Sequence, residues 1–250
     1  MRIPSLKDRW SSSPALGAWL FLREPLTAEA AARIGYDYVC IDLQHGYASQ
    51  VDALAMIQAA AGAGSIPVVR VASNDANLIG KSLDAGALAI IVPMVNTADD
   101  AARAVSACRY APVGTRSFGA LAAMDRYSGD FVEQSNEAVV CIPMIETAQA
   151  LENLEEILSV PGVDAIYVGP VDLSLTLGLP PKTYHDDERF LGAIAKIVDA
   201  CNRHGVVAGI HADADLSKHW TETGFKMITV SYDRTPMLAG MKADLLKARS

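Results

Sequence analysis

The sequence predicts one (β/α)8 barrel domain that spans residues 1–250. Short apolar segments rich in valine and isoleucine alternate eight times with segments whose apolar residues recur at helical spacing. The strand segments have no polar face, which is typical of parallel strands that are buried on both sides. A length of 250 residues with 51% hydrophobic residues is also typical of this barrel, because it allows one large core.

The predicted strands follow one another along the whole chain. They comprise residues 16–22, 38–44, 66–71, 87–95, 138–146, 165–172, 206–210 and 227–231. A helix is expected after each strand, with Thr27 and Thr97 as predicted N-caps and Gly35 and Gly205 as predicted ends. A doubly wound open sheet is the alternative fold, but no strand is followed by the glycine-rich loop that binds a dinucleotide.

Two segments fall outside this alternation. Residues 1–14 are expected to be a polar lead-in with Trp10 as its one apolar anchor. Residues 111–137 contain several glycines and no sustained period, and they are too long for an ordinary connection. A functional loop or lid is therefore predicted there, with a helical turn near residues 130–135.

Charge and cysteine content exclude several classes of partner. The net charge is −8 and the lysines and arginines form no cluster, so neither nucleic acid nor an anionic membrane is expected to bind. No uninterrupted apolar stretch reaches transmembrane length. The four cysteines are far apart and form no CxxC motif, so they are predicted to be small buried hydrophobic residues of a cytoplasmic protein.

The active site of such a barrel lies at the carboxyl ends of its strands. The polar residues predicted there are Asp42, Gln44, His45, Arg70, Asn96, Glu146, Asp172, His211, Asp213 and Asp233. Glu146 and Asp172 end two neighbouring parallel strands, so their carboxylates are expected to lie close together. Two carboxylates suit a divalent cation that prefers oxygen ligands, namely Mg²⁺, Mn²⁺ or Co²⁺.

His45 and Arg70 are the predicted partners of this carboxylate pair. His45 is interpreted as a general base whose imidazole is oriented by Asp42, three residues earlier. An ordinary packed Asp–His contact and a role for His45 as a third metal ligand are the alternatives. Arg70 belongs to an otherwise apolar strand and needs an anionic partner, which is either a neighbouring acid or an oxygen of the substrate.

The positions of the lysines and glycines exclude two further types of reaction and substrate. No lysine falls at the carboxyl end of a predicted strand, so a Schiff-base mechanism has no candidate amine. The segments after the seventh and eighth strands, IHADAD and SYDRTP, are not glycine-rich phosphate loops. An unphosphorylated substrate is therefore expected.

The chain resembles the HpcH/HpaI class II aldolases over almost its whole length. The resemblance rests on IDLQHG (41–46), VVR (68–70), DAGA (84–87), IVPMV (91–95), MIET (144–147) and VGPVDLSLTLG (168–178). It implies a metal-dependent lyase that cleaves a 4-hydroxy-2-oxo acid reversibly to pyruvate and an aldehyde through the pyruvate enolate. It also implies a barrel whose last helix packs on a neighbouring protomer, in a homo-oligomer that is a trimer or a hexamer.

Roles for the predicted residues follow from this resemblance. It implies that Glu146 and Asp172 bind the divalent metal cation and that His45, held by Asp42, transfers the proton. Arg70 would contact the keto oxygen of pyruvate and the enolate formed from it.

The resemblance also extends to residues around the substrate. It implies that Asp84 approaches the site from an adjacent subunit and that backbone amides around Gly169 and Pro170 receive the pyruvate carboxylate. Gln44 is counted among the substrate-binding residues, although many members carry an acid there and a glutamine in place of Met144. These two departures bear on the choice of aldehyde.

Two other functions are weighed against the aldolase. A CoA-ester lyase of the malyl or citryl type would use the same metal-binding acids, but this acidic chain offers no basic surface for the phosphates of CoA. A barrel that binds a 2-oxo acid without turning it over is the second alternative.

Overall fold

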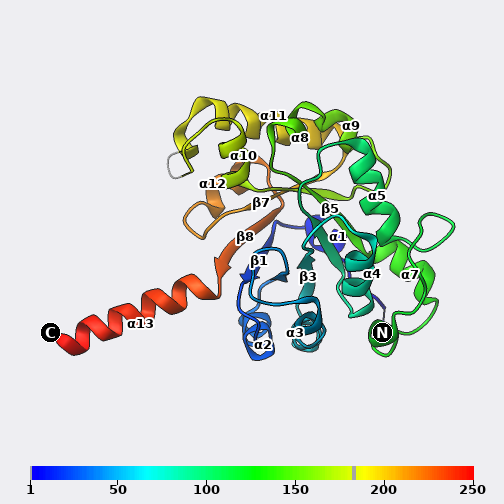
Figure 1. Ribbon diagram of the computed structural model, residues 1–250, viewed down its shortest axis with the longest axis horizontal. Coiled ribbons are helices and arrows are strands. Elements are labelled where there is room, and N and C mark those ends of the chain that lie inside the picture. The colour runs from blue at the N-terminus through cyan, green and yellow to red at the C-terminus, as the bar shows by residue number, and fades with distance from the viewer. Residues whose placement is uncertain (1, 182–183) are drawn as a thin grey trace.

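Eight parallel strands close into a barrel in the computed structural model, which describes residues 2–181 and 184–250 (Figure 1). The strands are β1 (Ala15–Leu20), β2 (Tyr38–Asp42), β3 (Ile66–Arg70), β4 (Ala89–Val92), β5 (Val140–Ile145), β6 (Ala165–Val168), β7 (Val207–His211) and β8 (Met227–Tyr232). Each strand pairs with its neighbours in sequence, and β8 pairs with β1. The predicted barrel is confirmed. Strands β4 and β6 end earlier than predicted, because the chain leaves the sheet at Pro93 and at Gly169.

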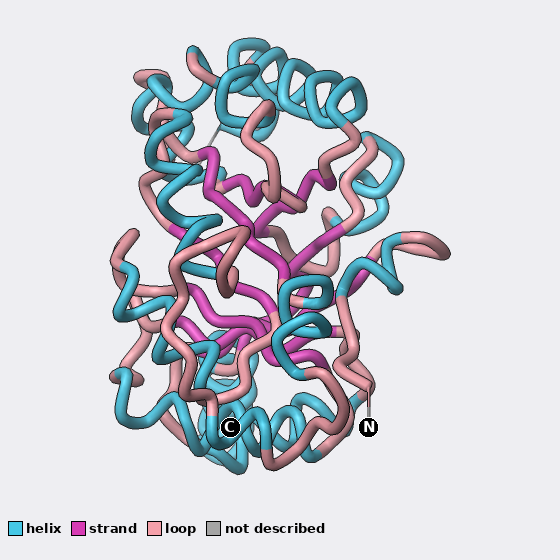
Figure 2. The backbone as a smooth tube through the Cα atoms, turned by 90° about the vertical axis from the view of Figure 1, so that its right-hand side faces the viewer, coloured by secondary structure: helices cyan, strands magenta, loops and turns pink. Residues whose placement is uncertain are grey.

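Helices surround the strands (Figure 2). They are α1 (Leu6–Trp10), α2 (Pro25–Ile34), α3 (Gln50–Gly62), α4 (Ala76–Asp84), α5 (Ala98–Cys108), α6 (Leu121–Met124), α7 (Phe131–Ala138), α8 (Ala148–Glu152), α9 (Leu154–Leu158), α10 (Pro170–Thr176), the 3-10 turn η1 (Tyr184–Asp186), α11 (Glu188–His204), α12 (Ser217–Thr223) and α13 (Arg234–Arg249). Thr97 caps α5 as predicted, and Gly35 and Gly205 end α2 and α11 in the left-handed conformation. The predicted cap at Thr27 is wrong, because the cap is Glu24, three residues earlier, which accepts from the backbone N–H of Leu26, and α2 begins at Pro25.

The core has an inner and an outer layer because side chains alternate along each strand. Outward side chains pack beneath the helices, and inward ones, including the fully buried Trp19 and Tyr38, fill the barrel. Gly17 leaves the space that the Tyr38 ring occupies, since a Cβ atom there would lie 2.1 Å from that ring. All four cysteines are free and buried, which confirms the interpretation of these residues as small hydrophobes.

The segment before β1 differs from the prediction. It forms helix α1, in which Leu6 is completely buried and Trp10 is 7% exposed. These side chains belong to the inner core and close the amino end of the barrel. The helix was not predicted because two apolar residues in a five-residue segment do not establish a helical period.

The irregular segment 111–137 also folds against the amino end. It contains α6 and most of α7, and Ser5 Oγ donates to the carbonyl oxygen of Ala138 at 2.7 Å. The backbone N–H of Ile3 donates to Gln134 Oε1 at 3.3 Å. Within its own chain this segment is therefore held beside the barrel rather than over the carboxyl ends of the strands.

Helix α13 projects away from the barrel and has no buried residue (Figure 1). Five apolar side chains of this helix are exposed: Met237, Leu238, Met241, Leu245 and Leu246. Among the described residues, no helix has the length and apolar character needed to cross a membrane.

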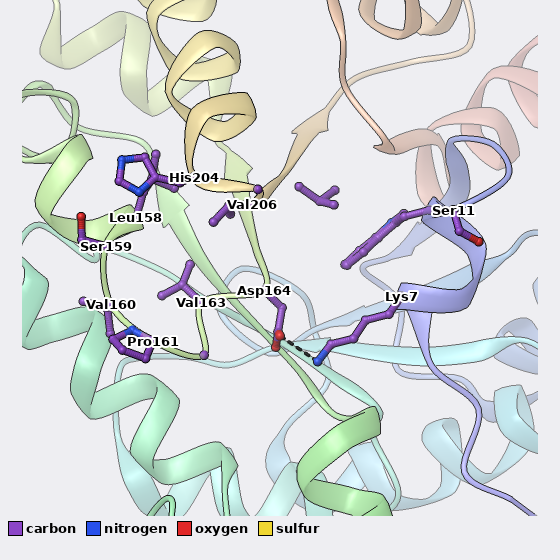
Figure 3. Close-up of a pocket in the computed structure, with 14 residues that line it drawn as sticks. Lys7, Ser11, Leu158, Ser159, Val160, Pro161, Val163, Asp164, His204 and Val206 are labelled. Carbon is purple, nitrogen blue, oxygen red and sulfur yellow. Dashed lines mark ion pairs between the residues drawn. The ribbon is translucent and has the colours of Figure 1, made fainter.

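The amino end also contains a cavity of about 620 Å³ beside the strand β6 (Figure 3). Lys7 reaches from α1 to Asp164, with 2.8 Å between Nζ and Oδ1. Arg109 Nη2 donates to the other carboxylate oxygen at 2.7 Å, and the backbone N–H of Cys141 donates to the same oxygen at 3.1 Å. Asp164 therefore joins α1, the end of α5 and β5 at the start of β6.

Candidate active site

Strand alternation brings a ring of functional side chains to the carboxyl end of the barrel. Tyr38 and Cys40 of β2 belong to the inner core, so Asp42, the next residue on the same face, also points inward. The same alternation turns Trp19, Arg70, Met144, Glu146, Gly169 and His211 toward the barrel axis. Their carboxyl-end positions surround a cavity of about 200 Å³, lined by Trp19, Phe21, His45, Arg70, Met144, Gly169, Pro170, Val171, Asp172 and His211.

A buried ion pair between Asp42 and Arg70 forms one wall of this site. The two residues are direct partners in the register of β2 and β3. Arg70 Nε and Nη2 donate to the two carboxylate oxygens at 2.9 and 2.5 Å, and the guanidinium carbon lies 4.9 Å from the ring centre of Trp19. Burial acts to raise the pKa of Asp42, but the hydrogen bonds and charge of Arg70 outweigh it and lower this pKa. Arg70 Nη1 takes no part in the pair.

Asp42 contacts His45 through the backbone and not through the imidazole. Its Oδ1 atom accepts from the backbone N–H groups of Gln44 at 3.0 Å and of His45 at 3.2 Å, while Oδ2 accepts from Trp19 Nε1 at 3.2 Å. The prediction that Asp42 orients the imidazole is therefore wrong for this chain, because Arg70, Trp19 and the two amides occupy both oxygens. Asp42 instead fixes the turn that carries the exposed His45 side chain into the cavity lining.

Glu146 lies behind the cavity lining, packed against Gly169, and is 2% exposed. Its Oε1 atom accepts from the backbone N–H of Met94 at 2.7 Å. Met94 has φ of 55°, a left-handed conformation that is strained for a residue other than glycine. Burial and the nearby charge of Asp172 raise the pKa of Glu146, although the bond from Met94 and the charge of Arg70 oppose the shift.

Asp172 approaches Glu146 from a helix and not from a strand end as predicted. Pro170 begins α10, and Asp172 lies exposed in the first turn of this helix. Gly169 makes the close approach possible, since a Cβ atom there would lie 2.7 Å from Glu146 Oε2. No group of three or more His, Cys, Asp and Glu side chains in the described ranges is arranged to hold a metal ion. The site therefore offers two neighbouring carboxylates as its candidate metal ligands.

Other residues predicted at this end have different positions. Gln44 does not line the cavity, and its Oε1 atom is buried without a hydrogen-bond partner in the described part of the chain. Asp84 ends α4 outside the cavity and pairs with Arg116 at 3.0 Å. The remaining candidates have structural contacts: Asn96 with Thr147, Asp213 with the backbone N–H of Leu216, and Asp233 with the backbone N–H groups of Phe21 and Leu22.

His211 lines the cavity at the carboxyl end of β7, as the sequence predicts, whereas Met94 is a site residue that the sequence reasoning missed. The His211 ring lies edge-on to Trp19, with 4.7 Å between ring centres, and 5.2 Å from Tyr232. Burial and the charge of Arg70 lower the pKa of His211 to about 4. Alternation from Gly209 indicates that His211 points inward. No comparable signal exists for Met94, because IVPMV has the composition of a continuous strand.

The chain is similar to proteins of known name over nearly its whole length. It matches the HpcH/HpaI aldolase/citrate lyase family over residues 15–239. It is 39% identical to a hydroxypyruvate/pyruvate aldolase of Rhizorhabdus wittichii, with 95% of each chain covered. It is 38% identical to a 2-dehydro-3,6-dideoxy-6-sulfogluconate aldolase of Pseudomonas putida, with 91% of this chain and 89% of that one covered.

Solved structures agree with this similarity. An HpcH/HpaI aldolase/citrate lyase family protein from Burkholderia cenocepacia superposes with a TM-score of 0.87 at 34% identity, covering 98% of this chain and 99% of the other. The fold, the length of the family match and the sequence identity to both aldolases all indicate the same family. This chain belongs to the HpcH/HpaI aldolase/citrate lyase family.

Proposed function

We propose that this chain is a class II aldolase, a carbon–carbon lyase that reversibly cleaves a 4-hydroxy-2-oxo acid to pyruvate and an aldehyde. The observation that carries the proposal is the convergence of Arg70, His45 and Asp172 at one cavity, with Asp42 paired to Arg70 and Glu146 buried beside Asp172 behind its lining. The related aldolases support the same reaction class.

Glu146 and Asp172 fit a divalent metal cation. Two carboxylates that lie close enough for one to raise the pKa of the other repel each other, and a cation between them removes that repulsion. An oxygen-only donor set favours Mg²⁺, Mn²⁺ or Co²⁺ over zinc. When bound, the ion supplies a Lewis acid for the carboxylate and keto oxygens of the substrate.

Arg70 is assigned to the charge that develops on the substrate. Asp42 engages Nε and Nη2 and holds the guanidinium in one orientation, so Nη1 is left to donate to the keto oxygen. Breaking the C3–C4 bond places negative charge on that oxygen, and a fixed donor in a buried site stabilises it. His45 accepts the proton of the C4 hydroxyl during cleavage and returns it during synthesis.

Backbone and amide groups complete the proposed substrate site. The amides beside Gly169 and Pro170 receive the substrate carboxylate at the start of α10; Pro170 has no N–H and contributes shape only. Gln44 lies outside the cavity lining and its Oε1 atom is buried, so we assign it no direct contact with the substrate.

The oligomer is proposed from α13 and Asp84. A helix that exposes five apolar side chains and contacts its own barrel so little is suited to pack on a neighbouring protomer. Asp84 lies outside the cavity of its own chain, so the role implied for it requires an adjacent subunit. We therefore propose a homo-oligomer, a trimer or a hexamer of barrel domains.

Sedimentation equilibrium tests this assembly and is expected to give the mass of three or six chains. The double substitution Met241→Glu with Leu245→Glu is expected to yield smaller species. A monomeric wild type would contradict the assembly.

The proposed partners are small molecules in the cytoplasm, with no nucleic acid and no membrane. Four free buried thiols support a reducing compartment. Arg70 is the one Lys or Arg side chain lining the cavity among the described residues, and it is already paired with Asp42. The cavity therefore has no free cationic side chain among the described residues that could bind the phosphates of a CoA ester.

Pyruvate release from a 4-hydroxy-2-oxo acid tests the proposal. We expect EDTA to abolish release and Mg²⁺, Mn²⁺ or Co²⁺ to restore it. Cleavage that continues in EDTA would contradict the role of Glu146 and Asp172. Pyruvate binding with no cleavage of any such acid, in the presence of metal, would favour the non-catalytic alternative.

A further inference from the structure

Trp19 contacts both members of the Asp42–Arg70 ion pair. Its indole Nε1 atom donates to Asp42 Oδ2 at 3.2 Å. The guanidinium carbon of Arg70 lies over the same indole, 4.9 Å from the ring centre. The proposed mechanism uses Arg70 but gives Trp19 no task, although this one side chain holds both partners of the pair.

Trp19 can act only through the residues that it contacts. It is 0% exposed although it borders the cavity, so its side chain offers no surface to a substrate. The indole is itself fixed by aromatic neighbours. The Tyr167 ring stacks on it with 5.6 Å between ring centres, and the His211 ring lies edge-on to it at 4.7 Å. Trp19 is therefore a rigid support for the ion pair.

The carboxylate of Asp42 has no acceptor capacity to spare. Oδ1 accepts from Arg70 Nε and from the backbone N–H groups of Gln44 and His45, and Oδ2 accepts from Arg70 Nη2 and Trp19 Nε1. A carboxylate offers about four lone-pair sites, so this set of donors fixes its plane. Loss of the indole donor would remove one constraint on the carboxylate and hence on the guanidinium that it binds.

The face of the indole acts on Arg70 directly. A tryptophan face attracts a guanidinium within about 6 Å of the ring centre, and the attraction is stronger where water is excluded. Arg70 is 7% exposed, so this condition is met. Asp42 holds the guanidinium along one edge and Trp19 holds it across one face. The two contacts together define a single orientation of the guanidinium.

We propose that Trp19 is a positioning residue whose indole holds the guanidinium of Arg70 in the orientation in which Arg70 donates to the enolate oxygen. The proposal rests on the proposed function, which assigns Arg70 to that oxygen. Negative charge is larger on the enolate oxygen than on the keto oxygen of bound pyruvate. A displaced guanidinium therefore costs more affinity for the enolate than for pyruvate.

The experiment compares an enolate analogue with pyruvate. Oxalate carries negative charge where the enolate oxygen would lie, so the dissociation constants of oxalate and pyruvate are measured by calorimetry at saturating Mg²⁺ in the wild type, Trp19→Phe and Trp19→Leu. Trp220→Leu is the matched control, because Trp220 is also buried and packs on two rings, those of His219 and Phe225, but lies outside the cavity. Arg70→Gln, alone and combined with Trp19→Leu, shows whether Trp19 acts through Arg70. Thermal unfolding verifies that each variant is folded.

We expect the Kd of oxalate, divided by that of pyruvate, to rise about tenfold or more in Trp19→Leu, which loses both the hydrogen bond and the cation–π contact. Trp19→Phe keeps a ring face against the guanidinium and should recover part of this ratio, and Trp220→Leu should keep the wild-type ratio. In the Arg70→Gln background, Trp19→Leu should change the ratio by less than about twofold. An unchanged ratio in Trp19→Leu, or an equal change with and without Arg70, would overturn the proposal.

Steady-state kinetics on the same proteins gives a second readout. In Trp19→Leu the kcat for cleavage of a 4-hydroxy-2-oxo acid should fall by a larger factor than KM rises, because the lost contact acts mainly on the charge that develops during cleavage. A rise in KM with unchanged kcat would overturn the proposal. If Trp19→Leu does not fold, Trp19→Phe decides, and a wild-type ratio of dissociation constants in that variant would overturn the proposal.

The design separates this proposal from the proposed function. A wild type that binds both acids but cleaves no 4-hydroxy-2-oxo acid would overturn the aldolase assignment, and the ratio of dissociation constants would still decide the role of Trp19. A wild type that cleaves such an acid, with the same ratio in every Trp19 variant, would overturn the role of Trp19 and leave the aldolase assignment intact. Absence of oxalate binding to an active wild type would have the same meaning.

Discussion

The two ends of the barrel each contain a buried pair of an aspartate and an arginine, but the two pairs serve different purposes. At the amino end Asp164 binds Arg109, Lys7 and the backbone N–H of Cys141, and so joins separate elements of the fold. At the carboxyl end Asp42 holds Arg70 by two of its three guanidinium nitrogens, and Arg70 lines the cavity.

The surroundings of the two pairs also differ: those at the amino end stabilise the fold, and those at the carboxyl end do not. Helix α1 covers the amino end with Leu6 and Trp10. The carboxyl end keeps two neighbouring carboxylates and a methionine in the left-handed conformation, which are features that lower stability. Barrel enzymes commonly divide their ends in this way, with stability at the amino ends of the strands and chemistry at the carboxyl ends. The comparison teaches that mutually repelling carboxylates and a strained backbone, more than a buried ion pair as such, indicate the functional end.

The largest expected effect is at the carboxyl end. Glu146→Gln keeps the acceptor for the Met94 N–H but removes the charge that would bind metal, so kcat/KM should fall by roughly 10³-fold or more. The free energy of unfolding in EDTA should stay the same or rise, because a buried carboxylate next to Asp172 is removed. Steady-state kinetics and urea unfolding measure the two quantities. A variant with full activity would show that Glu146 is not a metal ligand.

The amino end should respond in the opposite way. Asp164→Asn leaves Arg109 as an unpaired buried charge, and we expect the free energy of unfolding to fall by roughly 3–5 kcal/mol. The value of kcat/KM of the folded variant should remain within about threefold of the wild type, since Asp164 lies far from the cavity lining. Urea unfolding and kinetics at low temperature measure both. A large loss of activity with unchanged stability would reverse the proposed division between the two ends.

Acid should destabilise the carboxyl end through His211. Its pKa is lowered from 6.5 to about 4 in the folded protein, so its contribution to stability is complete above pH 6.5 and is lost as the pH falls to 4. The difference in unfolding free energy between the wild type and His211→Leu should therefore shrink by about 3 kcal/mol between pH 7 and pH 4. Urea unfolding across this range provides the test. A difference that does not change with pH would contradict the burial of a neutral imidazole.

The smallest effect concerns the strained turn at Met94. Glycine adopts a φ of 55° without the Cβ penalty, so Met94→Gly should raise the unfolding free energy by up to about 1 kcal/mol. Ala102→Gly on the exposed face of α5 is the control and should lower it by about 1 kcal/mol. Equal losses in the two variants would show that the turn is not strained.

Most of the fold could be predicted from the sequence because its strands are apolar and its helices are amphipathic. The ring of inward residues could also be predicted, since Asp42 and Arg70 are the last inward residues of adjacent strands. The sequence alone does not decide whether the anionic partner of Arg70 is a neighbouring acid or the substrate. In the structure the partner is Asp42, which lies directly opposite Arg70 in the register of β2 and β3.

The remaining features depend on contacts between distant segments. Asp172 belongs to α10 because Pro170 begins a helix there, although AIYVGPVD has the composition of a continuous strand. The left-handed turn at Met94 arises from its bond to Glu146, 52 residues away, and no local residue type encodes it. Asp42 does not bind the imidazole of His45 because Arg70 and Trp19, from neighbouring strands, engage its two carboxylate oxygens.

Binding of Mn²⁺ tests the central claim most directly, that the carboxyl end holds a divalent cation between Glu146 and Asp172. Titration of the metal-free protein, followed by electron paramagnetic resonance, should give one site per chain in the wild type and in Asp164→Asn. The same site should be absent in Glu146→Gln. A site that survives Glu146→Gln, or one that is lost in Asp164→Asn while the protein remains folded, would contradict the account.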